Sequence, residues 1–137
     1  MAVLGKDITA EDILDQMSFF DSWEEKYAFI IDLGKQLPVC ENCDCIEKNV
    51  VKGCQSQVWI TSFKHEDKFT FRANSDAIIV KGLLAIIIAA YNFKSSAEIL
   101  AFDIEDYFAQ LDLLQHISNV RGNGLKAMVD RVRSLVA

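Results

Sequence analysis

The sequence has few structure-breaking residues and no long apolar segment. Its 137 residues include one proline and six glycines. The longest fully apolar run, Leu83–Tyr91, has nine residues, well short of the about 20 that cross a bilayer. Because 14 basic side chains stand against 20 acidic ones, the chain lacks the basic face expected of a protein that binds nucleic acid or anionic membranes. The start shows no basic segment followed by an apolar one, so we expect no secretory signal and a cytoplasmic location.

What the chain does contain is enough apolar material for one core. Hydrophobic residues make up 51% of it, with nine Phe, two Trp and three Tyr, which excludes intrinsic disorder. At about 100–200 residues per domain, we expect residues 1–137 to form a single domain. The four cysteines would stay reduced in the cytoplasm, so they indicate metal binding or thiol chemistry rather than a disulfide framework.

The negative charge is concentrated near the start. Residues 1–50 carry 11 acidic and 4 basic side chains. Two interpretations are open: the carboxylates simply cover solvated helix faces, or they form a docking surface for a basic partner, whose complex would then be sensitive to salt.

The pattern of apolar and capping residues predicts helices, then a small sheet, then helices. Thr9 and Asp12 form a capping box that opens a helix to about Phe19. The following segments are expected to be a helix at 22–37, a polar loop at 39–49, strands at 50–51, 58–63 and 68–73 with a turn at 65–67, and a helix at 77–91 capped by Ser75 or Asp76.

The last third is predicted to be helical. Ser95 and Glu98 form a second capping box, and Asp103 is expected to cap a helix to about Leu111. Apolar residues at helical spacing from Leu125 onward predict a C-terminal amphipathic helix. The fold class is therefore α+β, a small antiparallel sheet covered on one face by helices.

The cysteines follow the spacing C-x2-C-x-C-x8-C. Four thiolates suit zinc or an iron–sulfur cluster, although two well-separated C-x2-4-C pairs are the more usual zinc arrangement. Cys40, Cys43 and Cys45 could thus share a metal with Cys54, take part in redox or sulfur handling, or have no defined role.

Cys54 stands in a different setting from the other three. Gly53 permits unusual backbone angles, Lys52 supplies a cation, and residues 55–57 supply amide and hydroxyl donors. Donors and positive charge around a sulfur favour the nucleophilic thiolate. The alternative is that Cys54 is a small buried apolar residue at the start of a strand.

The segment GCQSQVW at residues 53–59 resembles the signature of the SufE/CsdE sulfur-acceptor proteins, the Fe–S metabolism-associated domain. Residues 23–38, 75–83 and 115–128 are similar to other motifs of that family, in the same order. The resemblance covers about residues 20–137 and leaves residues 1–20 as a less well matched helical extension. It implies the α+β fold shared by SufE and the cluster scaffold IscU.

The resemblance also implies a function. A pyridoxal-phosphate (PLP) dependent cysteine desulfurase would pass persulfide sulfur to Cys54, which would relay it to an iron–sulfur scaffold or another sulfur acceptor. Such a protein stimulates the desulfurase, needs no cofactor or resident metal, and is an accessory carrier rather than a stand-alone enzyme. Family members rest with this side chain tucked beneath its loop, so loop 52–57 would swing outward about Gly53. Transfer is fastest when the thiol pKa is near ambient pH, so we expect the Cys54 pKa to be moderately lowered.

Several residues are expected to support Cys54. Arg121 would hold the loop or stabilise a thiolate, unless it is a surface or capping residue. His116 would tune a thiol, unless it is structural, and Asp76 would cap a helix and help to hold the resting loop. The complete set of expected supporting residues is Gly53, Gln55, Ser56, Gln57, Asp76, His116 and Arg121.

Two other functions remain open from the sequence. The first is a small zinc- or cluster-binding protein that uses Cys40, Cys43, Cys45 and Cys54. The second is a regulatory module that binds the desulfurase without carrying sulfur. The identity of the desulfurase and of the next acceptor, and whether the chain forms a homodimer, are not decided by the sequence.

Overall fold

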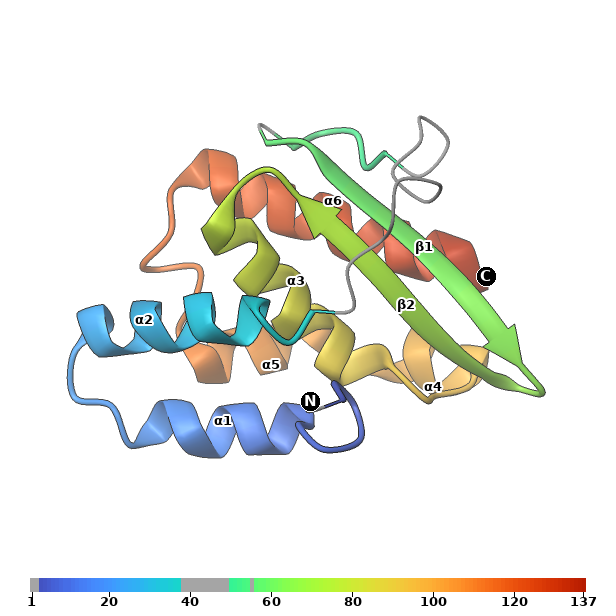
Figure 1. Cartoon of the computed structure of the whole chain (residues 1–137), viewed down its shortest axis with the longest axis horizontal. Helices are drawn as coiled ribbons and strands as arrows, with labels where there is room; N and C mark the ends of the chain where they lie inside the picture. The colour runs from blue at the N-terminus through green and yellow to red at the C-terminus, as the bar shows by residue number, and fades with distance from the viewer. Residues whose placement is uncertain (1–2, 38–49, 55) are drawn as a thin grey trace.

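The computed structural model describes residues 3–37, 50–54 and 56–137. It contains helices, then one antiparallel hairpin, then helices (Figure 1). The elements are α1 (Ala10–Ser18), α2 (Trp23–Gly34), β1 (Val58–His65), β2 (Lys68–Ser75), α3 (Ile78–Tyr91), α4 (Ser96–Ala101), α5 (Ile104–Leu111) and α6 (Asn119–Val136). The expected α+β class is confirmed.

Helix α3 forms the centre of the core. Twelve of its 14 residues are buried, which agrees with a sequence that is apolar on nearly every side. Helix α2 packs along one side, strand β2 lies on another, and α1 and α6 complete the enclosure (Figure 1). The chain therefore surrounds α3 with its other elements instead of exposing one of its faces.

The hairpin lies on this helical layer through one face. In β2 the side chains of Phe69, Phe71, Ala73 and Ser75 are buried alternately with more exposed neighbours, as expected for a strand with one face on the core. In β1 only Val58 and Ile60 are buried. Strand β2 therefore contacts the core along its length, whereas β1 does so only at the base of the hairpin, where Val58 pairs with Ser75.

Asn92 ties three segments together at the end of α3. Its side-chain oxygen accepts a hydrogen bond from the Phe71 N–H at 2.9 Å, and its Nδ2 donates to the Leu4 carbonyl at 3.0 Å. Its own N–H donates to the Ile88 carbonyl at 2.8 Å. Because Asn92 is 5% exposed, these bonds satisfy polar groups that burial would otherwise leave without partners.

Most helix boundaries follow the predicted capping residues. Thr9 and Ser95 form the predicted capping boxes, and Asp103 accepts a bond from the first turn of α5 as predicted. Ser22, the first residue of the second predicted helix, is the N-cap of α2. Helix α2 ends at Gly34 instead of Leu37, and the hairpin strands run past the predicted ends. Val50 forms only an isolated bridge to Trp59 instead of a strand, and the expected loop at 39–49 lies outside the described residues.

The predicted cap of α3 is wrong. Ala77 occupies the N-cap position and makes no side-chain capping bond. Ser75 Oγ accepts from the Ala77 N–H at 3.2 Å, before the helix begins, and the Asp76 carboxylate accepts from the Gln57 N–H at 3.0 Å. The Asp76 side chain therefore binds the loop before β1 instead of the helix.

Part of the acidity near the chain start has a structural role. Glu11 and Asp12 lie in the first turn of α1, and Glu24 and Glu25 lie in that of α2. Carboxylates there offset the partial positive charge of the helix N-terminus. Docking of a basic partner on this surface stays a prediction. In the described part of the chain, no helix combines the length and hydropathy needed to cross a membrane.

Helices α2 and α3 approach so closely that glycine is required between them. A Cβ added at Gly82 would lie 2.2 Å from the Ile30 carbonyl oxygen and 2.7 Å from Ile30 Cγ2. Because the first contact is with backbone, the two helices would have to separate.

We predict that Gly82→Ala lowers the free energy of unfolding by about 1–3 kcal/mol through overpacking. Gly122→Ala is the matched control, because a Cβ there would meet only Leu114 Cδ2, at 3.7 Å. This control should raise stability by about 0.5–1 kcal/mol through helix propensity. Urea unfolding midpoints test both, and equal midpoints for the two variants would contradict the close approach.

Candidate functional site

The loop that carries Cys54 is closed at its base by backbone pairing. The Val51 N–H donates to the Val58 carbonyl at 2.8 Å, and Val50 bridges Trp59. Residues 52–57 therefore span the gap between this short pairing and the start of β1. Gly53 has a φ of +92°, a left-handed conformation that an L side chain rarely adopts, so glycine is needed at the point where the loop turns.

Cys54 is partly buried between this loop and the first turns of α6. Its Sγ donates to the Gly124 carbonyl at 3.6 Å. A Cβ at Gly124 would lie 3.6 Å from that sulfur, so any other residue there would fill the space beside it. The glycine at 124 thus leaves room under the loop, while Gly122 lies near Leu114 and plays no such part.

A small cavity of about 20 Å³ adjoins the sulfur. Its walls come from the loop, the start of β1 and the first turns of α3 and α6. They are mostly apolar, with Ser56 and Arg121 as the polar members; the lining residues are Cys54, Ser56, Val58, Val80, Val120, Arg121, Gly124 and Met128.

Arg121 reaches the cavity from the third position of α6. Its backbone N–H is satisfied by Ser118 Oγ at 3.1 Å, which caps the helix. Its guanidinium Nη1 is buried and has no hydrogen-bond partner among the described residues. The side chain is therefore not simply a surface arginine: it lines the cavity beside Cys54 and has a buried donor that no described residue satisfies.

Burial raises the pKa of the Cys54 thiol. The expectation of a lowered pKa is wrong for this conformation, because the sulfur faces apolar side chains and a carbonyl acceptor, while Lys52 is exposed. A low-polarity setting disfavours the charged thiolate. At rest Cys54 is accordingly a neutral thiol and a weak nucleophile.

Asp76 holds the far end of the loop. Its Oδ1 accepts from the Gln57 N–H at 3.0 Å, and its own N–H donates to the Gln57 carbonyl at 3.4 Å. These two bonds join the loop to the segment between β2 and α3. The interpretation that Asp76 contacts the loop agrees with this geometry, although its expected capping role does not.

His116 lies apart from the cavity. It is exposed, its ring stacks on Trp23 with centroids 4.3 Å apart, and its Nε2 is 3.1 Å from Asp112 Oδ2. It does not line the space next to Cys54. Gln57 is exposed and contributes its backbone, and Gln55 lies outside the described residues.

The apolar walls of the cavity are residues that the sequence does not single out. Val58, Val80, Val120 and Met128 line it, yet in the sequence each is one member of a longer apolar pattern. Helical spacing indicates that Met128 faces inward, but it does not say that it faces a cysteine 74 positions earlier.

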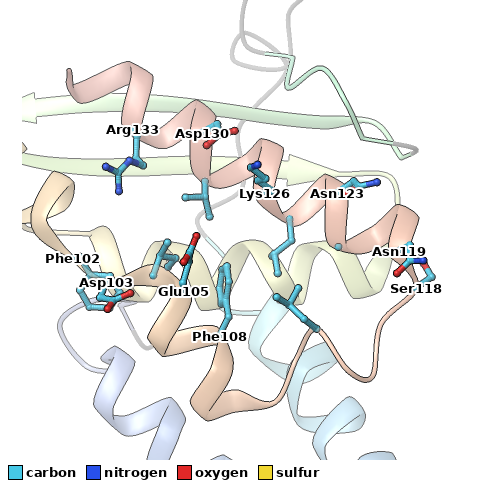
Figure 2. A pocket seen from close by; sticks show the side chains of 15 residues that line it. Phe102, Asp103, Glu105, Phe108, Ser118, Asn119, Asn123, Lys126, Asp130 and Arg133 are labelled. Atoms are coloured by element: carbon cyan, nitrogen blue, oxygen red, sulfur yellow. The ribbon is translucent and has the colours of Figure 1, made fainter.

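A larger groove of about 910 Å³ lies between α5 and α6. Figure 2 shows Glu105 and Phe108 on its α5 wall and Lys126 and Arg133 on its α6 wall. Cys54 does not line it, and none of the residues predicted to support Cys54 does. Helix α6 therefore presents different residues to the groove and to the Cys54 cavity.

A metal site cannot be assembled from the part of the chain that the structure describes, where no three His, Cys, Asp or Glu side chains come together. Cys54 is a free thiol in this part. Cys40, Cys43 and Cys45 lie outside the described residues, so the zinc or cluster alternative stays a hypothesis.

Comparisons with known proteins agree on one family. The family model described as "SufE: Fe-S metabolism associated domain" matches residues 11–136. An uncharacterized SufE-like protein of Rhizobium meliloti (strain 1021) is 39% identical over 128 residues, which is 90% of this chain and 91% of that protein. A second uncharacterized SufE-like protein, from Rhizobium etli, is 39% identical over 127 residues, covering 90% of this chain and 86% of that one.

The fold has a solved counterpart as well. A hypothetical protein from Thermus thermophilus, determined in solution, superposes with a TM-score of 0.77 over 94% of this chain and 93% of that one. At 15% identity this likeness concerns the fold alone. The match over residues 11–136 and the two relatives lead to one conclusion: the chain belongs to the SufE family of Fe–S metabolism-associated domains.

Proposed function

We propose that this protein accepts sulfur from a PLP-dependent cysteine desulfurase as a persulfide on Cys54 and relays it to iron–sulfur cluster assembly or another sulfur-using pathway. Membership of the family supports a role in Fe–S metabolism. The observation that carries the finer proposal is the placement of Cys54, a free thiol on a closed loop over its own small cavity. Such a cavity is of use to a carrier that protects a reactive group between two encounters.

In the resting geometry Cys54 is sheltered, and it has to move before it reacts with a donor. A space of about 20 Å³ admits no protein donor, so Cys54 must leave the cavity to meet one. Gly53, with its φ of +92°, is the pivot, and the Gln57–Asp76 bonds fix the other end. Once Cys54 reaches water, the burial that raises its pKa is lost, and the thiolate fraction increases.

The transfer itself needs no cofactor on this chain. The Cys54 thiolate attacks the outer sulfur of the donor persulfide, a new S–S bond forms on Cys54, and the donor cysteine leaves as a thiolate. The S–H proton of the donor persulfide stays on the transferred sulfur or passes to water. The number of electrons does not change, so no oxidant or reductant takes part.

The surroundings of the loop support a protein partner. Ile78, in the first turn of α3, is 66% exposed, and Val120, in the first turn of α6, is 52% exposed. Val120 also lines the Cys54 cavity, and Ile78 follows Asp76 by two residues. Exposed aliphatic side chains beside a reactive group offer apolar contact area to a docking protein.

The proposal is tested by incubating the protein with a cysteine desulfurase and cysteine, then recording intact masses. Wild type should gain about 32 Da, one sulfur atom, and Cys54→Ser should gain none. Failure of wild type to gain sulfur would overturn the proposal, and a gain retained by Cys54→Ser would move the carrier role to Cys40, Cys43 or Cys45. Stimulation of the desulfurase by Cys54→Ser equal to that of wild type would instead favour a regulatory module.

The raised pKa predicts how Cys54 reacts with iodoacetamide as a function of pH. In a variant with Cys40, Cys43 and Cys45 changed to Ser, the rate should rise with pH about a midpoint above that of the same chain unfolded in urea. The sign follows because burial penalises the thiolate only in the folded state. A folded midpoint at or below the unfolded one would contradict the burial of the thiol.

The Gln57–Asp76 contact predicts that Asp76→Ala loosens the loop. Loss of a hydrogen bond to a carboxylate should raise the alkylation rate of Cys54 at neutral pH by about tenfold. Asp112→Ala is the matched control, since it removes a carboxylate that contacts His116 and leaves the loop intact. Equal rates for the two variants would show that Asp76 does not hold the resting position.

A further inference from the structure

The groove between α5 and α6 has no part in the proposed function. Its volume is about 910 Å³, and none of its lining residues lines the Cys54 cavity. On α6 the lining runs from Ser118 to Arg133, which at 1.5 Å per residue is about 22 Å. The groove is half open to solvent, so a ligand in it keeps one long face in water. A small molecule is usually enclosed over most of its surface, so these dimensions favour an elongated ligand.

The buried part of the lining is apolar. It consists of Ile104 and Phe108 on α5 and of Leu125 and Val129 on α6. Leu114, between the two helices, lines one end of the groove and is 58% exposed. Apolar surface that is bordered by polar residues and open to solvent is typical of a site that binds another protein.

The two rims of the groove differ in charge. Asp103 and Glu105 line the α5 side, and Figure 2 shows Glu105 pointing from α5 toward α6. On the α6 side, Lys126 and Arg133 outnumber Asp130, which lies between them. In the part of the chain that the structure describes, no ion pair joins the two rims. An occupant with cations on one flank and carboxylates on the other complements both.

The walls favour a helix over an extended peptide as the occupant. Both walls are α-helices, whose backbone groups are already paired within the helix, so they offer no edge to a strand. An extended segment would bring its own N–H and C=O groups into an apolar groove without partners, at a cost in free energy. A helix pairs these groups internally and presents an apolar stripe, as in other cases where a helix binds a groove.

A second copy of this chain does not complement the groove. Two grooves that face each other are both concave and would leave a void between them, whereas stable interfaces are closely packed. Helix α1 ends beside Phe19, which is 71% exposed, but it contains acidic residues and no basic one. It therefore has no cation to pair with Glu105, and the occupant is a segment of another protein.

We propose that the groove between α5 and α6 is a docking site for an amphipathic helix of another protein, with basic residues on the flank that faces α5 and acidic residues on the flank that faces α6. The inference does not rest on the proposed function. Because the groove and the Cys54 cavity share no lining residue, a protein held in the groove leaves Cys54 free to react.

The proposal is tested with three cross-linked helical peptides of about 14 residues, or four turns. All three have a stripe of leucines; one has lysines on one flank and glutamates on the other, one has lysines on both flanks, and one has glutamates on both. In fluorescence anisotropy, the mixed peptide should bind roughly tenfold more tightly than the other two, because each of those puts like charges against one rim. Absence of binding by the mixed peptide, or equal affinity for all three, would overturn the proposal.

Reversal of one charge on the α5 rim tests the assignment of the flanks. With Glu105→Lys, the mixed peptide should lose about tenfold in affinity and the all-glutamate peptide should bind more tightly than before. Glu24→Lys is the matched control, because it makes the same change at the second residue of α2, as Glu105 is the second residue of α5, and lies outside the groove. Equal effects of the two variants would mean that the peptides respond only to net charge and would contradict the site.

The apolar contact is tested with two exposed aliphatic residues. Leu114→Ser removes apolar area from the groove, whereas Ile78→Ser removes it from the first turn of α3, where Ile78 is 66% exposed and outside the groove. Leu114→Ser should weaken binding of the mixed peptide by about fivefold, and Ile78→Ser should not change it. A loss confined to Ile78→Ser, or shared equally, would place the peptide elsewhere on the surface.

Sedimentation of the protein without peptide tests the second copy as occupant. Wild type and Glu105→Lys should sediment alike, because the groove is not an interface between copies. A wild-type dimer that Glu105→Lys dissociates would overturn the proposal.

The rate of Cys54 alkylation tests whether the two sites are separate. In the variant that retains Cys54 alone, iodoacetamide should react at the same rate with and without saturating mixed peptide. A slower rate in the bound protein would show that the peptide covers the Cys54 loop and would contradict docking in the groove.

Discussion

A helix that is apolar on all sides must be covered on all sides, and this constraint organises the fold. Helix α3 has no polar face to give to water, so α2, the hairpin, α1 and α6 are all placed against it. Because Gly82 has no side chain, the backbone of α2 at Ile30 comes into direct contact with α3. Burial of aliphatic side chains at about 25 cal/mol per Å² is the main stabilising contribution, and in this chain it converges on one element.

The site lies at one end of this assembly. The first turns of α3 and α6 and the base of the hairpin meet there, and the Cys54 loop covers the place where they meet. Three core elements form the walls of the cavity, and the Cys54 loop lies over it. In the proposed function, this arrangement would keep a reactive group apart from its next acceptor until the loop moves.

Much of the architecture could be predicted because its causes are local. Capping boxes at Thr9 and Ser95 mark helix starts through bonds to residues three positions away. The alternation of apolar and polar residues around Phe69 and Phe71 is also a local pattern, and it predicts a strand with one buried face. The short motif around Cys54 singles out that cysteine as the candidate sulfur carrier, although the residues of the motif do not say what surrounds the sulfur.

The failures concern interactions between distant segments. Asp76 is of a residue type that often caps helices, but its carboxylate accepts a hydrogen bond from Gln57, 19 positions earlier in the chain. The sequence neighbours of Cys54 predict a lowered pKa, whereas the cavity walls, which come from three other elements, raise it. His116 matches a family motif, yet it stacks on Trp23. Sequence patterns report local geometry well and electrostatic surroundings poorly.

The backbone pairing at the base of the loop has a consequence for how the molecule moves. Val51 bonds to Val58 on one side, and Gln57 bonds to Asp76 on the other, so the loop can open while the hairpin and α3 stay paired. Opening of this kind is a local fluctuation with its own free energy, independent of global unfolding. In a hydrogen-exchange experiment, the amides of loop 52–57 would then exchange faster than those of β1. If Cys54 leaves the cavity as proposed, substitutions that change how often it does so can therefore accumulate without loss of the fold.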